Sequence, residues 1–381
     1  MNSRERVLAS LSHQEPDMVP FDLGGTTVTS ISSVAYKNAM EYQNLSSSGS
    51  YMHDTIQQIV IPSIENLNFL GVDTIRLGPP RIHDLNKIKE NGEILKYVDE
   101  WQIPWQKNKT YDFYFNEVGE PPFSKCNSLE DLANCQFPDP ADYIDWGALI
   151  IKSKTIPSDK ALIIDRNCAG ILEMSLRIRG YAEFYSDMAA EPELAEFLLD
   201  KVLENKIRYW DSILSIAGER ADVISECDDL GSQQGLLISR DMYRTLIKPR
   251  QKKLFAFIKS KAPNAKIFYH SCGAISELIP DFIEVGIDIL NPVQTTASGM
   301  APEKIKQEFG KDIVFWGGGI NTQVTLPRGT PQQVRDEVKR AIEVFSKGGG
   351  YIFASIHNIQ ADVPPENFWA MIDEFQKNRR L

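Results

Sequence analysis

Residues 266–294, KIFYHSCGAISELIPDFIEVGIDILNPVQ, decide the fold of this chain. The stretch begins with a short apolar run, continues through a segment with apolar residues at helical spacing, and ends in a second apolar run. One face of the middle segment carries Ile275, Leu278, Ile279, Phe282 and Ile283. No hairpin signal joins the two apolar runs. The order therefore predicts two parallel strands connected by a helical crossover.

The same alternation repeats along the chain. Strand-like runs lie at residues 71–78, 161–170, 221–229, 266–273, 287–294, 312–319 and 349–358, and residues 19–25 offer an eighth. This count favours a (β/α)8 TIM barrel, an α/β fold, although an open parallel sheet gives a similar alternation. We expect one domain over residues 1–381, with an N-terminal extension before the first strand.

Residues 82–150 interrupt the alternation. The segment predicts antiparallel strands with turns at Asn91-Gly92 and Gly119-Glu120, which makes it a β-rich insertion decorating the barrel. Its aromatic residues either cover the mouth of the barrel or form an oligomer contact; these are Tyr111, Phe113, Tyr114 and Phe115.

Composition limits the classes of function. The chain has 381 residues, 42% of them hydrophobic and 24% charged, which is typical of a soluble globular protein. Its formal charge of −11 argues against nucleic acid or an acidic membrane surface as the main partner. The sequence has no apolar run long enough to span a membrane, and its first residues lack an apolar leader. Five cysteines without framework spacing indicate a reducing, cytoplasmic environment.

FYHSCG, residues 268–273, is the first candidate for chemistry. Catalytic residues of a TIM barrel lie at the C-terminal ends of its strands, and this motif ends one of them. His270 and Cys272 are two residues apart, so strand periodicity points both side chains to one face. Imidazole and thiolate are ligands that zinc prefers. The pair is half of a metal site, or else an ordinary strand end.

Two other strand ends offer further ligands. In SECDD, Glu226 and Asp228 share one face, while Cys227 and Asp229 share the other. His357 stands at the end of the last strand. We therefore predict a set of nitrogen, oxygen and sulfur ligands from Glu226 or Asp228 with His270, Cys272 and His357, and we expect Cys227 to pack in the barrel wall.

Several other features carry alternatives. The triple glycine at residues 317–319 either cradles a phosphate on its N–H groups or makes the tight turn that leaves the barrel. We expect Cys126 and Cys135 to be incidental. The remaining histidines are expected to be solvated; they are His13, His53 and His83.

Longer segments resemble the uroporphyrinogen decarboxylase superfamily. They include RERVLASLSHQEPDMVPFD (4–22), GVDTIRLGPP (71–80), LRIRGYAEFYSDMAAEPELAEFLLDKVLE (176–204), CDDLGSQQGLLISRDMYRTLIKPR (227–250), HSCGAISELIPDFIEVGIDILNPVQ (270–294), WGGGINTQVTLPRGTPQQVRDEV (316–338) and GGGYIFASIHNIQADVPPEN (348–367). The resemblance covers nearly the whole chain and implies a TIM barrel. Enzymes that decarboxylate uroporphyrinogen carry an arginine-rich stretch after the first strand. Residues 21–37 contain no arginine here, which argues against a porphyrin substrate.

The other branch of the superfamily contains cobamide-dependent methyltransferases. Its zinc members carry H-x-C, matched here by His270 and Cys272, and a later cysteine where this chain has His357. The pattern resembles members that demethylate a small compound such as a methoxylated aromatic. The resemblance implies zinc held by His270 and Cys272, with Glu226 and His357 as further ligands.

Position at the ends of the predicted strands indicates roles for other residues. Asp228 or Asp229 orients the substrate or the metal. The expected substrate-binding residues are Arg76, Asn291, Gln294 and Asn358, each of which could instead make ordinary loop hydrogen bonds. Because the corrinoid motif D-x-H-x-x-G is absent from the sequence, the cobamide is expected on a partner corrinoid protein. Alternatives are a metal-free decarboxylase or lyase of a small acid, and a non-catalytic ligand-binding barrel.

Overall fold

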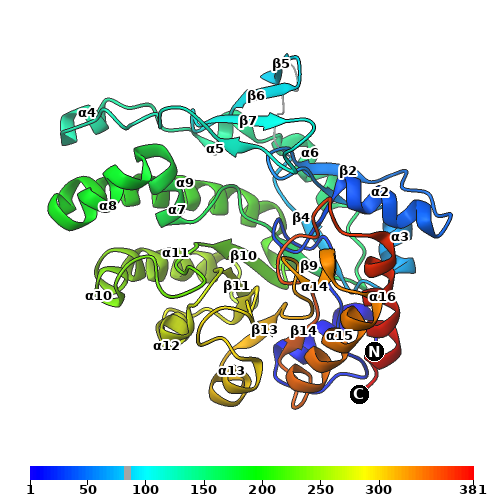
Figure 1. Cartoon of the computed structure of the whole chain (residues 1–381). Coiled ribbons are helices and arrows are strands. Elements are labelled where there is room, and N and C mark those ends of the chain that lie inside the picture. The colour runs from blue at the N-terminus through cyan, green and yellow to red at the C-terminus, as the bar shows by residue number, and fades with distance from the viewer. Residues whose placement is uncertain (81–86) are drawn as a thin grey trace.

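The computed structural model describes residues 1–80 and 87–381, and a parallel seven-stranded sheet lies at its centre (Figure 1). The strands are β4 (Thr74–Leu77), β9 (Ala161–Ile164), β10 (Val223–Cys227), β11 (Lys266–His270), β12 (Ile289–Asn291), β13 (Val314–Trp316) and β14 (Tyr351–Ile352). Their spatial order follows the chain, from β4 at one edge to β14 at the other. Each predicted run contains one of these strands, so the alternating pattern is confirmed.

The predicted eighth strand joins the two edges of the sheet. On one side Phe353, just after β14, donates its N–H to the carbonyl of Pro20 and accepts the N–H of Asp22, both at 2.9 Å. On the other side Asp73, just before β4, donates its N–H to the carbonyl of Phe21 at 2.8 Å. These hydrogen bonds close the sheet, and the fold is a TIM-barrel-like α/β structure, as expected.

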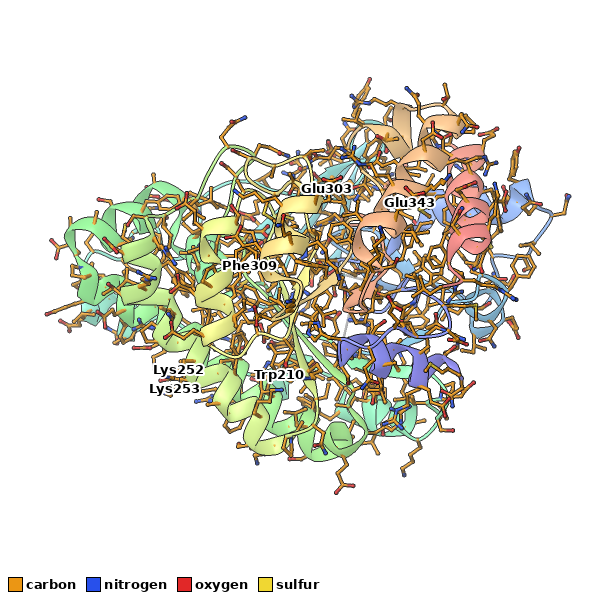
Figure 2. All side chains as sticks on the ribbon, turned by 90° about the horizontal axis from the view of Figure 1, so that it is seen from below. Trp210, Lys252, Lys253, Glu303, Phe309 and Glu343 are labelled. Carbon is orange, nitrogen blue, oxygen red and sulfur yellow. The ribbon has the colours of Figure 1, made fainter. Side chains whose placement is uncertain are left out.

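Helices cover the outside of the sheet. The main ones are α7 (Ile171–Arg179), α8 (Tyr181–Ala190), α9 (Pro192–Ala217), α11 (Lys248–Lys261), α12 (Ile279–Glu284), α13 (Pro302–Phe309), α15 (Pro331–Phe345) and α16 (Pro365–Asn378), with the shorter α10 (Arg240–Met242) and α14 (Thr325–Arg328) between them. Figure 2, seen from below, shows charged residues such as Lys252 and Glu343 on the outer faces, whereas Trp210 of α9 is buried against the sheet. None of the described helices is long and apolar enough to cross a membrane.

The inside of the barrel is filled by alternate strand residues. Val223, Phe268 and Val314 belong to one apolar cluster that also contains Val7 and Leu11 of helix α1 (Ser3–Leu11). The helix lies across the N-terminal ends of the strands, because its first residues bind carboxylates that precede β4 and β10. Space for a ligand is therefore left at the C-terminal ends, where active sites of such barrels lie.

Two small antiparallel sheets lie beyond that end. One, which the sequence did not predict, contains β1 (Ile31–Ser32), β3 (Ile59–Ile61) and β2 (Tyr51–Asp54), and α2 (Ser33–Tyr42) and α3 (Ile64–Phe69) adjoin it. The other is the predicted insertion, with β5 (Lys89–Asn91), β6 (Ile94–Val98), β7 (Pro104–Asn108) and β8 (Asn116–Glu117), followed by α4 (Leu129–Ala133), α5 (Pro140–Tyr143) and α6 (Trp146–Ser153).

The turns of the insertion match the sequence in part. The turn at Asn91-Gly92 joins β5 to β6, as predicted. Gly119-Glu120 follows β8 and joins no pair of strands, so that prediction was wrong; the hairpin between β6 and β7 turns instead on Asp99, whose side chain accepts backbone N–H groups of the turn. The predicted boundary at residue 82 and His83 lie outside the described residues.

Candidate active site

A cavity of about 750 Å³ opens at the C-terminal ends of the strands. Residues after β9, β10, β11 and β14 line it, and both small sheets contribute to its wall. Its volume falls in the range of about 300–1,000 Å³ that is usual for small-molecule sites. His270, Cys272 and His357 all line it, and their nitrogen and sulfur atoms lie within 4.8 Å of one another. The barrel thus brings three predicted metal ligands together.

The orientation of His270 is fixed by Asn291. Nδ1 of His270 lies 2.5 Å from Oδ1 of Asn291, and the amide of Asn291 donates to the carbonyl of Trp316 at 2.8 Å. Because that second bond makes Oδ1 the acceptor, we infer that Nδ1 of His270 carries the proton. Nε2 then presents its lone pair to Sγ of Cys272 at 3.3 Å. Burial lowers the pKa of His270 to about 4, so the imidazole is neutral.

Cys272 is held by the turn that follows β11. Its N–H donates to Oδ1 of Asp229 at 2.9 Å, and the N–H of Gly273 donates to Gln294 at 2.8 Å. Gly273 has φ +88°, and a Cβ there would lie 2.5 Å from the backbone of Gly231. Only glycine fits this turn. Burial, and then the charge of Asp229, raise the pKa of the Cys272 thiol, so binding it as a thiolate requires a compensating cation.

His357 faces the same space but carries its ring proton on the other nitrogen. Its Nδ1 accepts the backbone N–H of Asn358 at 2.8 Å, which leaves the ring proton on Nε2. The ring centroids of His357 and His270 are 5.3 Å apart. Burial and the neighbouring His270 lower the pKa of His357 to about 4. In this orientation His357 presents an N–H to the cavity, and it becomes a metal ligand only if its ring turns.

The structure reverses the predicted faces of β10. Cys227 pairs in register with His270 and lines the cavity, whereas we expected it in the wall. Glu226 points the other way, toward α9, where its carboxylate accepts Lys206 Nζ at 2.8 Å and Trp210 Nε1 at 2.6 Å. Both partners are fully buried outside the barrel sheet. The geometry therefore does not support Glu226 as a metal ligand, because alternation sends its side chain to the helical layer.

The two aspartates that follow β10 differ as well. Asp228 accepts the N–H groups of Leu172 and Glu173 at 2.7 and 2.8 Å, in the first turn of α7, and does not line the cavity. Burial raises its pKa well above the usual value. Its position is that of a structural cap. Asp229 lines the cavity, 3.8 Å from Nε2 of His270, and is the better placed of the two to orient a substrate.

The predicted substrate-binding residues also separate into two groups. Gln294 and Asn358 line the cavity, although each already makes hydrogen bonds to the loops around it. Asn291 lies behind His270 and does not line the cavity, and Arg76 is turned away to bind Asp165. The contacts of Asn291 and Arg76 thus support positioning roles and not contact with substrate.

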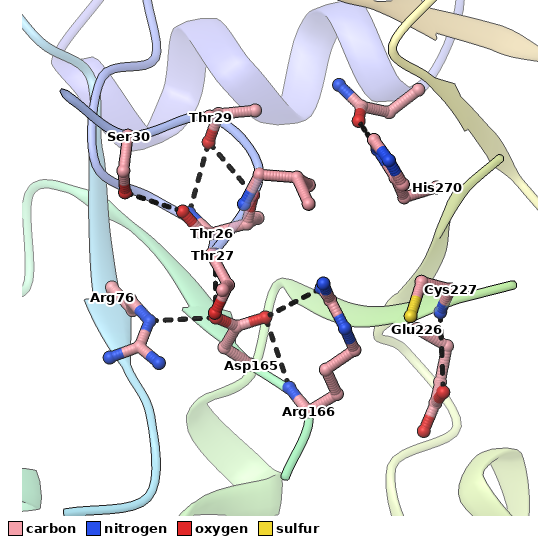
Figure 3. Close-up of polar contacts among 12 residues, drawn as sticks. Thr26, Thr27, Thr29, Ser30, Arg76, Asp165, Arg166, Glu226, Cys227 and His270 are labelled. Atoms are coloured by element: carbon pink, nitrogen blue, oxygen red, sulfur yellow. Dashed lines mark hydrogen bonds and ion pairs between the residues drawn. The ribbon is translucent and has the colours of Figure 1, made fainter. Parts of the chain in front are cut away.

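Sequence reasoning missed two arginines that line the cavity, Arg166 and Arg177. In Figure 3 the side chain of Arg166 extends from the end of β9 into the space between residues 26–30, His270 and Cys227. Its signal was present in the run ALIIDRNCAG, which was read only as a strand. Polar residues at the end of a predicted barrel strand are candidates by position alone.

The insertion contributes a further wall of the cavity. Arg177 of α7 binds Glu173 at 2.7 Å and Glu117 of β8 at 3.0 Å, and its guanidinium lies 5.3 Å from the centroid of the Trp105 ring. Of the predicted insertion aromatics, Tyr114 and Phe115 line the cavity, while Tyr111 and Phe113 are exposed and do not line it. Two of the four aromatic residues thus line the cavity.

The triple glycine forms a turn. Gly317 has φ +116°, and the N–H groups of residues 317–319 are bonded to the carbonyls of Ile352, Pro292 and Ala354. No N–H of this turn is left for a phosphate, so the alternative of a tight turn is the correct one. Cys126 and Cys135 lie away from the cavity, with their sulfur atoms 3.3 Å apart.

Comparisons with known proteins identify the family and the fold of this chain. A uroporphyrinogen decarboxylase from Psychromonas ingrahamii is 29% identical over 187 residues, 48% of this chain and 48% of that enzyme, so the alignment spans about half of the relative. One from Pseudoalteromonas atlantica is 22% identical over 80% of this chain and 81% of its own. A methyltransferase from Methanosarcina mazei shares the fold, with a TM-score of 0.68 and 20% identity over 99% of both chains. The model of the uroporphyrinogen decarboxylase (URO-D) family matches residues 114–377, and the chain belongs to that family.

Proposed function

We propose that the protein is a zinc-dependent methyltransferase, which moves a methyl group between a small methylated substrate and the cobalt of a separate corrinoid protein. The observation that carries this proposal is the pairing of His270 Nε2 with Cys272 Sγ at 3.3 Å on the cavity wall. The methyltransferase fold of the Methanosarcina mazei protein supports the reaction class by analogy.

The donor atoms fit a zinc ion. The neutral imidazole of His270 is already held with its lone pair toward the cavity, and second-layer groups that fix a ligand in this way raise metal affinity. The thiol of Cys272 would lose its proton on binding, as zinc ligands do. Zinc would supply Lewis acidity at the oxygen of a methyl ether. His357 is within reach, with its N–H toward the same space.

Other residues of the chain would orient the substrate and shield it from water. Asp229 holds the turn of Cys272 and faces His270, so it can orient the substrate. The insertion wall around Trp105 would shield the site from water on one side. Methyl transfer to cobalt then requires a corrinoid protein to dock at the open end of the barrel, since this sequence contains no corrinoid motif.

Metal analysis is the direct test. Protein purified without added zinc is expected to contain about one zinc per chain, the occupancy of a single structural or catalytic site. His270→Ala and Cys272→Ala should lose it, whereas Cys135→Ala, which removes a thiol outside the cavity, should retain it. Equal zinc in all four proteins would refute the proposed site. Mixing the protein with Co(I) corrinoid protein and a panel of methyl ethers should give a methyl-Co(III) spectrum.

A decarboxylase of a small acid is the second candidate. It is favoured by the family match and by Arg166, a cation in the cavity. Release of carbon dioxide from a panel of small acids, unaffected by His270→Ala, would establish it in place of methyl transfer.

A further inference from the structure

Asp165 sits between two arginines at the end of β9. Its side chain is fully buried and accepts Nε of Arg76 at 2.8 Å, and Arg166 Nη1 lies 3.6 Å from its other oxygen. Thr27 adds two more hydrogen bonds, from its N–H and its hydroxyl. The carboxylate is thus satisfied without a hydrogen bond from the Arg166 guanidinium. Two positive charges face one negative charge, and the trio has a net charge of +1.

The excess charge is at Arg166. Its side chain is 9% exposed and lines the cavity. Within residues 1–80 and 87–381, Nη1 is buried and has no hydrogen-bond partner. Leaving a buried donor without a hydrogen bond costs free energy, and more when the group is charged. A ligand that accepts from this guanidinium would remove that cost.

Six acidic residues line the cavity, and three of them have partners that bear on the charge of Arg166. Glu173 and Glu117 both bind Arg177, at 2.7 and 3.0 Å. Asp229 accepts the N–H of Cys272. In the described part of the chain, Asp165 is the one carboxylate within ion-pair distance of Arg166, and it is shared with Arg76, which leaves a second anion to the ligand.

We propose that Arg166 binds the carboxylate of the substrate, so that the substrate is a small carboxylic acid carrying the group that reacts near His270 and Cys272. A planar guanidinium matches a carboxylate in a bidentate contact. A single negative charge also balances the net +1 of the Arg76, Asp165 and Arg166 trio, whereas a phosphate dianion would exceed it. This inference rests on the proposed function for the reacting group and on the cavity alone for the carboxylate.

Binding of benzoate and of benzamide, its neutral analogue, tests the proposal. Trp101 and Trp105 line the cavity, so quenching of tryptophan fluorescence can report binding, with calorimetry as a second measurement. Wild type should bind benzoate more tightly than benzamide. Arg166→Gln should lower the affinity for benzoate by about 10-fold or more, the loss expected for a charge-assisted hydrogen bond, and leave the affinity for benzamide unchanged. Arg166→Lys keeps the charge without the forked guanidinium, and its affinity for benzoate should fall between those of wild type and Arg166→Gln.

The controls separate this inference from the metal proposal. Arg208→Gln removes an exposed arginine of α9 and should bind benzoate as wild type does. His270→Ala, and wild type treated with a chelator, should still bind benzoate, because Arg166 is intact in both. Failure of zinc binding with benzoate recognition preserved would refute only the methyltransferase.

Three outcomes would overturn the carboxylate site. They are equal affinity of wild type for benzoate and benzamide, tighter binding of phenyl phosphate than of benzoate, and an affinity of Arg166→Gln for benzoate equal to that of wild type. If Arg166→Gln fails to fold, judged by circular dichroism, the Arg166→Lys and analogue comparisons decide.

Discussion

Asn291 holds the imidazole of His270 through a 2.5 Å hydrogen bond to Nδ1, and its own amide is fixed by the carbonyl of Trp316. The two bonds together set which nitrogen of His270 faces Cys272. Sequence reasoning had placed Asn291 in contact with substrate. Its full burial behind the histidine makes it a positioning residue instead.

The first prediction follows from that relationship. Asn291→Ala should weaken zinc binding by about 10- to 100-fold, the usual effect of removing the group that orients a metal-bound histidine. Asn291→Asp keeps an acceptor for Nδ1 and should lose less. Competition with a fluorescent chelator measures both affinities. Zinc affinity of Asn291→Ala equal to that of wild type would mean that the orientation of His270 does not depend on this bond.

Glu226 gives a second prediction, about stability. Glu226→Gln leaves the fully buried ammonium of Lys206 without its counter-ion, and removing one member of a buried pair typically costs about 3–5 kcal/mol. Urea unfolding should show this loss, while zinc content stays unchanged because the carboxylate faces α9. Glu204→Gln breaks the exposed pair with Lys201 on the same helix and should change stability by less than about 1 kcal/mol. Loss of zinc in folded Glu226→Gln would restore Glu226 as a ligand.

The fold was readable because each strand of the barrel is a short apolar run followed by a helix. The closing segment at residues 19–25 was also predicted as a strand, from the sequence VPFDLGG. The small sheet of β1, β2 and β3 was not readable. Its strands are only two to four residues long, and pairing across the chain defines them more than any local alternation.

The site was readable where position along one strand decided it, as for His270 and Cys272. The prediction of the site failed where it depended on how two strands lie beside each other. Alternation divided Glu226 from Cys227, but the face that meets His270 depends on the register between β10 and β11. Arg166 was missed for a related reason, because its importance lies in the charge balance with Arg76 and Asp165, which are brought together by the fold.

The third prediction concerns pH in the metal-free protein. Burial lowers the pKa of His270 to about 4 from 6.5, so below pH 6.5 the unfolded chain takes up a proton that the folded chain does not. The contribution of neutral His270 to the free energy of unfolding is therefore present above pH 6.5 and is lost as pH falls toward 4. Between pH 7 and 5 we expect a loss of about 1–2 kcal/mol from this residue. Urea midpoints at the two pH values measure it. His270→Gln should show a smaller decrease, and an identical decrease in both proteins would contradict the assignment.

The fourth prediction decides the role of His357. Because its Nδ1 accepts the N–H of Asn358, its Nε2–H can donate to a ligand without binding metal. His357→Ala should then keep its zinc while the rate of methyl transfer falls by about 10-fold, the order of one lost hydrogen bond. His357→Cys introduces a thiolate at the position where the family resemblance predicts one, and should hold zinc more tightly against a chelator. Zinc lost from His357→Ala as completely as from His270→Ala would show instead that the ring turns and that His357 is the third ligand the sequence predicts.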